Sequence, residues 1–142
     1  MPKITTFLYC EGSQNEVLPK GGNKLHLIGP MLKLTPMFIP SMFSFSVCIS
    51  IEDVSIDTQH VGKFVFNNPE GEEVINTGDV PMAIQPEAID PTDEIHSLLL
   101  GLDFRNVVLK TEGVYVGKIY FDGELLGEQS IKAKEAIVKW GC

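Results

Sequence analysis

The sequence has few of the residues and patterns that mark several large classes of protein. Its 142 residues include one tryptophan and 11 Lys and Arg against 19 Asp and Glu, which gives a formal net charge of −8. Because the basic residues are few and scattered, the chain should repel phosphate backbones and anionic lipid headgroups. No apolar run approaches the roughly eighteen residues that a membrane-spanning helix requires. We therefore expect the chain to bind neither nucleic acid nor a membrane.

Cysteine is also scarce, with only Cys10, Cys48 and Cys142 in the whole chain. An odd number of widely spaced cysteines is neither a disulfide framework nor a zinc motif. Cys10 and Cys48 each lie in an apolar run, which is typical of a buried free thiol, and a bridge between sheets is the alternative. The residues from Met1 to Phe7 lack the layout of a secretory signal. With Met1 as the true start, we predict a cytoplasmic protein.

Known catalytic motifs are missing as well. The sequence contains no Gly-x-Ser-x-Gly elbow, no His-Glu-x-x-His pair, no Walker loop and no Gly-x-Gly-x-x-Gly turn. The three histidines, His26, His60 and His96, are far apart along the chain. We expect each to be a strand or loop residue that makes a hydrogen bond and has no catalytic role. An end of the fold could still bring two of them together.

Two segments give clear strand signals. Gly113–Phe121 and Glu124–Ile131 are strand-like runs joined by Asp122-Gly123, a dipeptide that favours the positive φ angles of a tight hairpin turn. Met42–Ile51 alternates strictly between large apolar residues and small ones, mostly serine. Such alternation predicts a strand with one face in the core. We expect the serine face to be solvated or to lie under another surface.

Shorter strand-like runs, separated by glycine and proline, occupy the rest of the chain. They cover Lys3–Cys10, Lys24–Leu34, Val61–Asn67, Glu72–Ile75, Val80–Ile84, Ile95–Asp103 and Asn106–Lys110. We expect a polar loop over Glu11–Asn23, and one helical turn is the alternative to a strand over His96–Leu100. The pattern predicts one all-β domain over residues 1–142, a two-layer antiparallel β-sandwich, Ig-like or C2-like, of about eight or nine strands. We expect the last strand to reach about Ala133, with 134–142 a short helix or flexible tail.

Open strand edges in such a sandwich need protection against unwanted pairing. Pro30 cannot donate to a ladder and so marks an edge or a bulge, and Lys63, Lys110 and Lys118 have the charge that blunts an edge. An unprotected edge would favour self-association or the addition of a strand from a partner.

One loop has the composition of a metal site. Asp90, Asp93, Glu94 and His96 lie within seven residues, and clustered carboxylates at a sandwich end can hold Ca²⁺. Their spacing does not match an EF-hand, and Asp-Pro-Thr-Asp is also a good solvated turn or helix-cap sequence. Apart from Ca²⁺ at this loop, we predict no cofactor.

Both ends of the chain resemble an uncharacterised family of small bacterial domains. In that family a strand ending in Cys or Ala plus an acidic residue precedes a Lys-Leu-x-Leu-x-Gly strand, as Phe7–Glu11 precedes Lys24–Pro30 here. Its Gly-x-Tyr strand and Asp-Gly hairpin resemble Gly113–Tyr115 and Asp122–Gly127. The resemblance implies a β-sandwich and a bacterial or phage origin, and it implies no activity and no site residues.

These observations favour a non-enzymatic binding or accessory module. We expect it to act through a sandwich edge or end loops, on a protein partner or on a second copy. One alternative is a metal-dependent enzyme that uses the Asp90–His96 loop together with another histidine. The other alternative is a structural subunit of a phage particle or another homo-oligomeric assembly.

Overall fold

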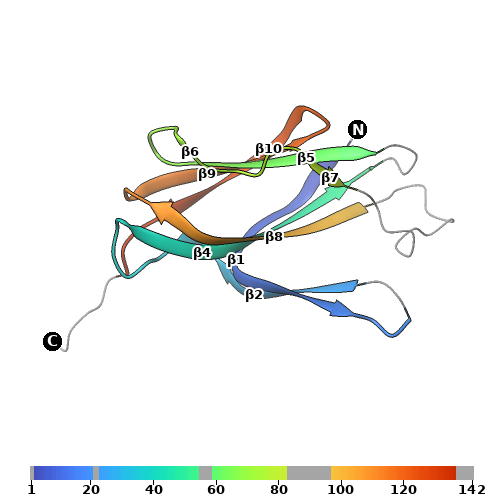
Figure 1. The fold of residues 1–142 in the computed structure, drawn as a ribbon, viewed down its shortest axis with the longest axis horizontal. Helices are drawn as coiled ribbons and strands as arrows, with labels where there is room; N and C mark the ends of the chain where they lie inside the picture. Colours follow the sequence, from blue (N-terminus) through green and yellow to red (C-terminus); the bar gives the residue numbers. More distant parts are fainter. Residues whose placement is uncertain (1, 21–22, 55–58, 83–96, 137–142) are drawn as a thin grey trace.

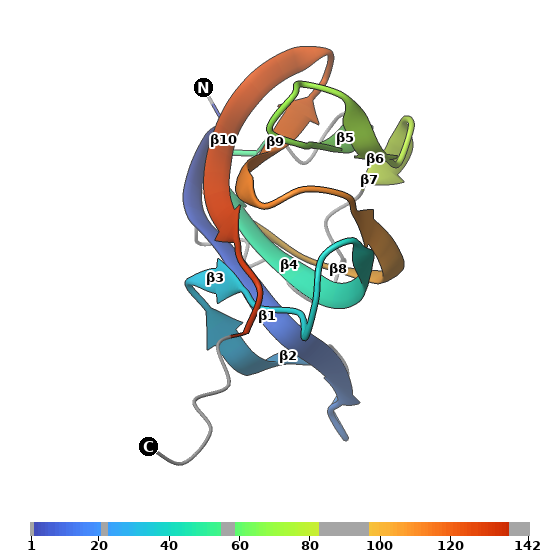
Figure 2. The same ribbon diagram turned by 90° about the vertical axis from the view of Figure 1, so that its left-hand side faces the viewer.

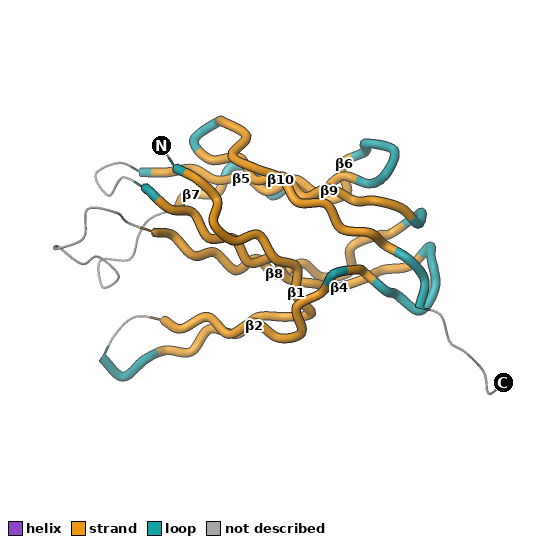
Figure 3. The backbone as a smooth tube through the Cα atoms, turned by 180° about the vertical axis from the view of Figure 1, so that it is seen from behind, coloured by secondary structure: helices purple, strands orange, loops and turns teal. Residues whose placement is uncertain are grey.

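The described part of the chain consists of β-strands and the turns between them (Figure 3). A computed structural model describes residues 2–20, 23–54, 59–82 and 97–136. Its ten strands are β1 (Lys3–Val17), β2 (Asn23–Met31), β3 (Lys33–Leu34), β4 (Ser41–Glu52), β5 (His60–Asn67), β6 (Glu73–Asn76), β7 (Val80–Met82), β8 (Ser97–Leu109), β9 (Gly113–Phe121) and β10 (Glu124–Ala133).

The strands form two sheets that stack face to face (Figure 1). The first sheet has the order β2-β1-β4-β8, and the second has the order β3-β10-β9-β5-β6, with β7 also paired to β5. All pairs are antiparallel except the short β3–β10 pair. The predicted two-layer antiparallel β-sandwich is therefore confirmed.

The core lies between the sheets and follows the predicted alternation of β4. Phe45, Val47, Ile49 and Ile51 are all buried, and they pack against the buried residues of β5 and β9. Aromatic rings join the layers, with 5.3 Å between the ring centres of Phe45 and Phe66. Burying each such ring contributes about 1.5–3 kcal/mol, so this face positions the two sheets.

The Asp-Gly hairpin is also confirmed. Asp122 and Gly123 have φ angles of 53° and 86°, and the flanking strands β9 and β10 pair in antiparallel register. Positive φ at both central residues is the geometry that a two-residue hairpin turn requires.

Strand β1 is longer than predicted, because it changes partner along its length. Its first half pairs with β4 from Lys3 to Cys10, and its second half pairs with β2 from Tyr9 to Val17. The expectation of a loop over Glu11–Asn23 was therefore wrong for residues 11–17. Sequence periodicity could not show this change of partner, since residues 12–17 are mostly polar and the first half of β1 pairs with β4, about 40 residues away in the chain.

The distal β1–β2 hairpin lies over the outer face of the first sheet (Figure 1). The Ser13 hydroxyl donates to Asp103 Oδ1 of β8 at 3.0 Å, and a Cβ atom at Gly101 would lie 3.2 Å from Leu25 Cδ1. As a result Ser46, on the outer face of β4, is buried. The serine face of β4 thus lies partly under another surface, one of the two predicted outcomes.

Cys10 and Cys48 are both free and buried, as predicted. They lie on adjacent strands of the first sheet, because Cys10 is opposite Ser46 and Leu8 is opposite Cys48. A bridge between the sheets, the alternative interpretation, was therefore wrong. Burial raises the pKa of both thiols, which keeps them protonated and unreactive.

Strand β8 and the segment after β10 differ in part from their predicted structure. The runs Ile95–Asp103 and Asn106–Lys110 belong largely to one strand, β8, in which Asn106 has a φ of 55° and forms a bulge opposite Ser44. Residues 97–100 are strand, so the helical alternative was wrong there. After β10 the chain runs beside residues 34–36 without forming a helix as far as Ala136. Residues 137–142, the rest of the predicted tail, lie outside the described residues.

Candidate functional site

Most strand edges in the described residues are short or obstructed. Pro30 lies on edge strand β2, as predicted, and β6 and β7 have only four and three residues. On β10, the short strand β3 pairs with Lys132 and Ala133, and the Tyr9 hydroxyl donates to the Gln129 carbonyl at 2.8 Å. Short strands, prolines and charges are common ways to prevent edge pairing.

The predicted role of two lysines in edge protection was wrong. Lys63 lies on β5 and Lys118 on β9, and both strands are inside the second sheet. The Lys63 ammonium lies 4.7 Å from the centre of the Tyr120 ring, a cation–π contact. Sequence spacing cannot distinguish an inner strand from an edge, because strand order depends on distant pairings.

Among the described strands, β8 is a long edge whose segment Ser97–Leu102 lacks such protection. It has 13 residues and, among the described strands, pairs only with β4 (Figure 2). The segment Ser97–Leu102 contains four leucines, no charge and no proline. A long apolar edge with free backbone donors and acceptors is a template for the pairing of another strand.

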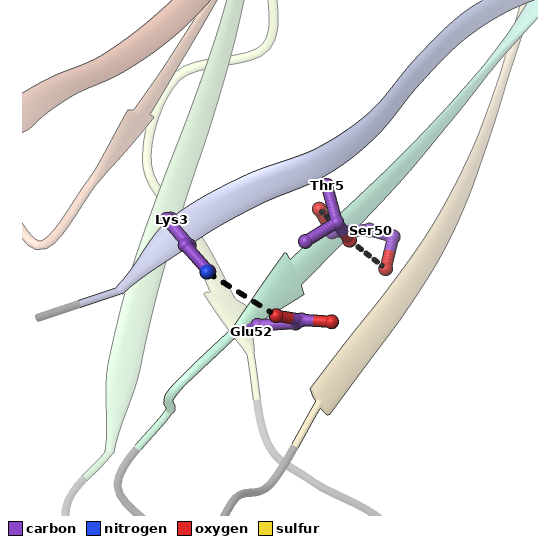
Figure 4. Close-up of polar contacts among 4 residues, drawn as sticks. All are labelled: Lys3, Thr5, Ser50 and Glu52. Atoms are coloured by element: carbon purple, nitrogen blue, oxygen red, sulfur yellow. Dashed lines mark hydrogen bonds and ion pairs between the residues drawn. The ribbon is translucent and has the colours of Figure 1, made fainter.

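The outer face beside β8 changes from polar to apolar at this edge. Thr5 Oγ1 of β1 donates to Ser50 Oγ of β4 at 2.9 Å (Figure 4), and Ser50 lies opposite Leu99 of β8. In the next row Lys3 Nζ lies 3.8 Å from Glu52 Oε2, and Glu52 lies opposite Ser97. Leu99 is 55% exposed. Leu99 thus places an exposed apolar side chain at the margin of the sheet, beside these two polar rows.

The straight part of this edge ends at the bulge. Arg105 and Asn106 together face Ser44, and the Asn106 N–H donates to Ser44 Oγ at 3.0 Å. Before the bulge, Asp103 accepts hydrogen bonds from Ser13 and Ser46. Because a bulge twists the strand and interrupts its ladder, the segment available for regular pairing is Ser97–Phe104. We call this segment the open β8 edge.

The open β8 edge was missed as a specific site, although the sequence prediction did include a sandwich edge in general terms. The signal was present in Leu98-Leu-Leu-Gly-Leu102, a run without polar alternation, lysine or proline. Only the strand order shows that this run is at an edge and not in the centre of a sheet.

A histidine–aspartate pair lies at the β9–β10 turn. His60 Nδ1 lies 2.7 Å from Asp122 Oδ2, the Val61 N–H donates to Asp122 Oδ1 at 2.9 Å, and the imidazole stacks on Phe121. Burial raises the pKa of the Asp122 carboxyl, but the hydrogen bonds from His60 and Val61 lower this pKa by a larger amount. The pKa of Asp122 therefore lies below its usual range. The pair joins the hairpin turn to the start of β5.

We expect Asp122→Asn to reduce stability at neutral pH by about 1 kcal/mol or less, because the carboxyl is partly solvated. Asparagine tolerates the positive φ of this position. Since the folded-state pKa of Asp122 is lowered, its contribution is present above the unfolded pKa and is lost as pH falls through the folded value. Melting temperatures of both proteins from neutral to acid pH should therefore converge at low pH. Parallel curves would contradict this assignment.

The four predicted metal ligands come from one segment of the chain. Asp90, Asp93, Glu94 and His96 all lie in 83–96, outside the described residues. Within the described ranges no group of three or more His, Cys, Asp or Glu side chains could hold a metal ion. His26 and His60 each make a hydrogen bond with a carboxylate, as expected for structural histidines.

Two hollows in the described surface are small. One, of about 190 Å³, lies between β1, β4 and β8 and includes Ser13, Ser46 and Asp103. The other, of about 210 Å³, lies between the β5–β6 turn and the end of β8 and includes Asn68 and Lys110. Sites for small-molecule ligands usually occupy about 300–1,000 Å³, so neither hollow favours such a ligand.

A model of a family of unknown function, DUF6941, matches residues 12–134. The chain belongs to this family. The DUF6941 match includes Lys24–Pro30 and the closing hairpin, two of the segments behind the predicted resemblance, whereas Phe7–Glu11 precedes it. No curated protein matched the chain. The described part of this DUF6941 chain has no helix that is long and apolar enough to cross a membrane.

Proposed function

We propose that this domain is a non-enzymatic binding module that adds a strand of a protein partner to the open β8 edge. The observation that carries the proposal is the uncharged, proline-free segment Ser97–Leu102 along an edge without a partner among the described strands. In strand addition, main-chain hydrogen bonds provide affinity and alternate side chains provide specificity. Leu99 would provide the apolar contact on the outer face.

The proposal places this interaction in the cytoplasm. Cys10 and Cys48 are unpaired thiols on adjacent strands. Free thiols are usual where the surroundings are reducing, whereas secreted domains of this size often contain disulfides.

We expect Leu99→Lys to abolish partner binding while the domain stays folded. Leu99 is exposed, so a lysine fits without disturbing the core, and a charge at an edge opposes strand pairing. The matched control is Val114→Lys, since Val114 is 51% exposed but lies on inner strand β9. Extracts of cells that carry the gene would be passed over the wild type and both variants, and the bound proteins compared by mass spectrometry.

Circular dichroism would first show that both variants are folded. A partner retained by the wild type and Val114→Lys but lost by Leu99→Lys would support the proposal, particularly if the purified partner slows amide hydrogen exchange in residues 97–104. A partner that Leu99→Lys still binds, with unchanged exchange in β8, would contradict it.

A further inference from the structure

We infer that the open β8 edge pairs with the same edge of a second copy of this chain, antiparallel about a two-fold axis at Leu100. The inference rests on the proposed function, because it names the partner of the same edge. The first sheet of one copy and the first sheet of the other would then join into one continuous sheet, with four strands from each copy.

The alternation of β8 limits the registers in which two copies can pair. Leu98 is buried and Leu100 and Leu102 are half-buried on the inner face, whereas Leu99 and Gly101 lie on the outer face. Residues directly opposite each other in an antiparallel pair share a face. A two-fold axis at Leu100 satisfies this condition, because it places Leu98 opposite Leu102 and Leu100 opposite itself. The inner apolar row of one copy would therefore continue into that of the other.

On the outer face this register places Leu99 beside an apolar side chain of the other copy. Leu99 of one copy would lie opposite Gly101 of the other, a large side chain against a residue that has none. Leu25 of the β1–β2 hairpin already reaches Gly101, since a Cβ atom there would be 3.2 Å from Leu25 Cδ1. The leucine of the second copy would therefore meet an apolar neighbour and would be removed from water.

The two ends of the paired segment are complementary in polarity. The same register places Ser97 opposite Asp103. Asp103 Oδ1 accepts hydrogen bonds from Ser13 and Ser46, and within the described residues Oδ2 has no hydrogen-bond partner. The hydroxyl of Ser97 from the second copy can donate to this oxygen, and a hydrogen bond to a carboxylate is stronger than a neutral one.

Local electrostatic repulsion is limited in this register. Asp103 of one copy would share an outer-face row with Ser97 and Glu52 of the other, and Lys3 Nζ lies 3.8 Å from Glu52 Oε2 and offsets its charge. Each copy has a formal net charge of −8, but Ser97–Leu102 is uncharged. In this register the two Asp103 side chains are separated by six positions, which is about 20 Å along the strands. Beyond Asp103 the bulge at Arg105 and Asn106 ends the straight segment, so the pairing stops before further charges meet.

Two measurements test the inference. Light scattering of the wild type over a wide range of concentration should show a monomer–dimer equilibrium. Leu99→Lys should raise the dissociation constant about tenfold or more, whereas Val114→Lys should leave it unchanged. Because the register is specified, cysteine cross-linking under mild oxidation gives the second measurement. In a Cys142→Ser background, Leu100→Cys should form a disulfide-linked dimer.

The matched control for cross-linking is Leu102→Cys in the same background. Leu102 is also half-buried, but the two copies of residue 102 would lie about 13 Å apart along the strands, too far for a disulfide. Cross-linking at 100 and not at 102 supports the register, and the reverse result overturns it.

The two proposals can fail separately. A wild type that is monomeric at every concentration overturns the second copy as partner, and so does a dimer that survives Leu99→Lys. In either case, capture of a different protein that depends on Leu99 would still support the open β8 edge as a binding surface. Capture that is insensitive to Leu99→Lys would overturn the proposed function itself.

Discussion

Replacement of Phe66 by alanine should lower the free energy of unfolding by about 3–5 kcal/mol, as is usual for the loss of a buried aromatic ring. Phe66 of β5 is fully buried. Its ring centre lies 5.3 Å from that of Phe45 in the opposite sheet and 5.4 Å from that of Tyr115 in its own. The substitution therefore removes the ring that joins the two layers and leaves a cavity that rigid neighbouring rings cannot close.

Urea unfolding would measure this loss, which should appear as a lower midpoint with an unchanged slope. Phe38→Ala is the control, because Phe38 is 64% exposed and should change stability by less than about 0.5 kcal/mol. Similar losses for the two variants would show that Phe66 is not at the centre of the core. Since small domains are stable by about 5–15 kcal/mol, Phe66→Ala could leave a partly unfolded protein at 37 °C.

The second large effect is expected at Gly117 of β9, where alanine should cost about 1–3 kcal/mol through overpacking. A Cβ atom there would lie 2.3 Å from the Tyr9 hydroxyl oxygen and 3.1 Å from the Phe64 ring. Neither ring can move freely, because Tyr9 and Phe64 are both buried. The Tyr9 hydroxyl also donates to the Gln129 carbonyl of β10. Thermal unfolding of Gly117→Ala would measure the cost.

Gly62→Ala is the matched control for this prediction. Its new Cβ atom would be even closer to a neighbour, 2.0 Å from Met82 Cε, but a methionine end can rotate away. We therefore expect a smaller loss at Gly62 in spite of the shorter distance. In addition, Tyr9→Phe removes the clashing oxygen, so it should be less destabilising in the Gly117→Ala background than in the wild type. Strict additivity of the two substitutions would contradict the proposed contact.

Sequence periodicity predicted the elements whose structure depends on neighbouring residues. The alternation from Met42 to Ile51 specified both the strand and its buried face, because side chains on a strand alternate between its faces. Asp122-Gly123 specified a hairpin, because these two residues tolerate the required positive φ angles. These local signals were enough to predict an all-β sandwich.

The location of the candidate site depended on pairings between distant residues, which local patterns do not contain. Lys63 and Lys118 have the composition of edge residues but lie on inner strands, whereas Leu98–Leu102 resembles a central strand but lies at an edge. The sequence by itself determined the strand character and the inward face of most elements, since both follow from local alternation and turn chemistry. Only the tertiary structure decided that β1 changes partner at Tyr9 and that β8 pairs with β4 alone among the described strands, because strand order results from contacts between segments far apart in the chain.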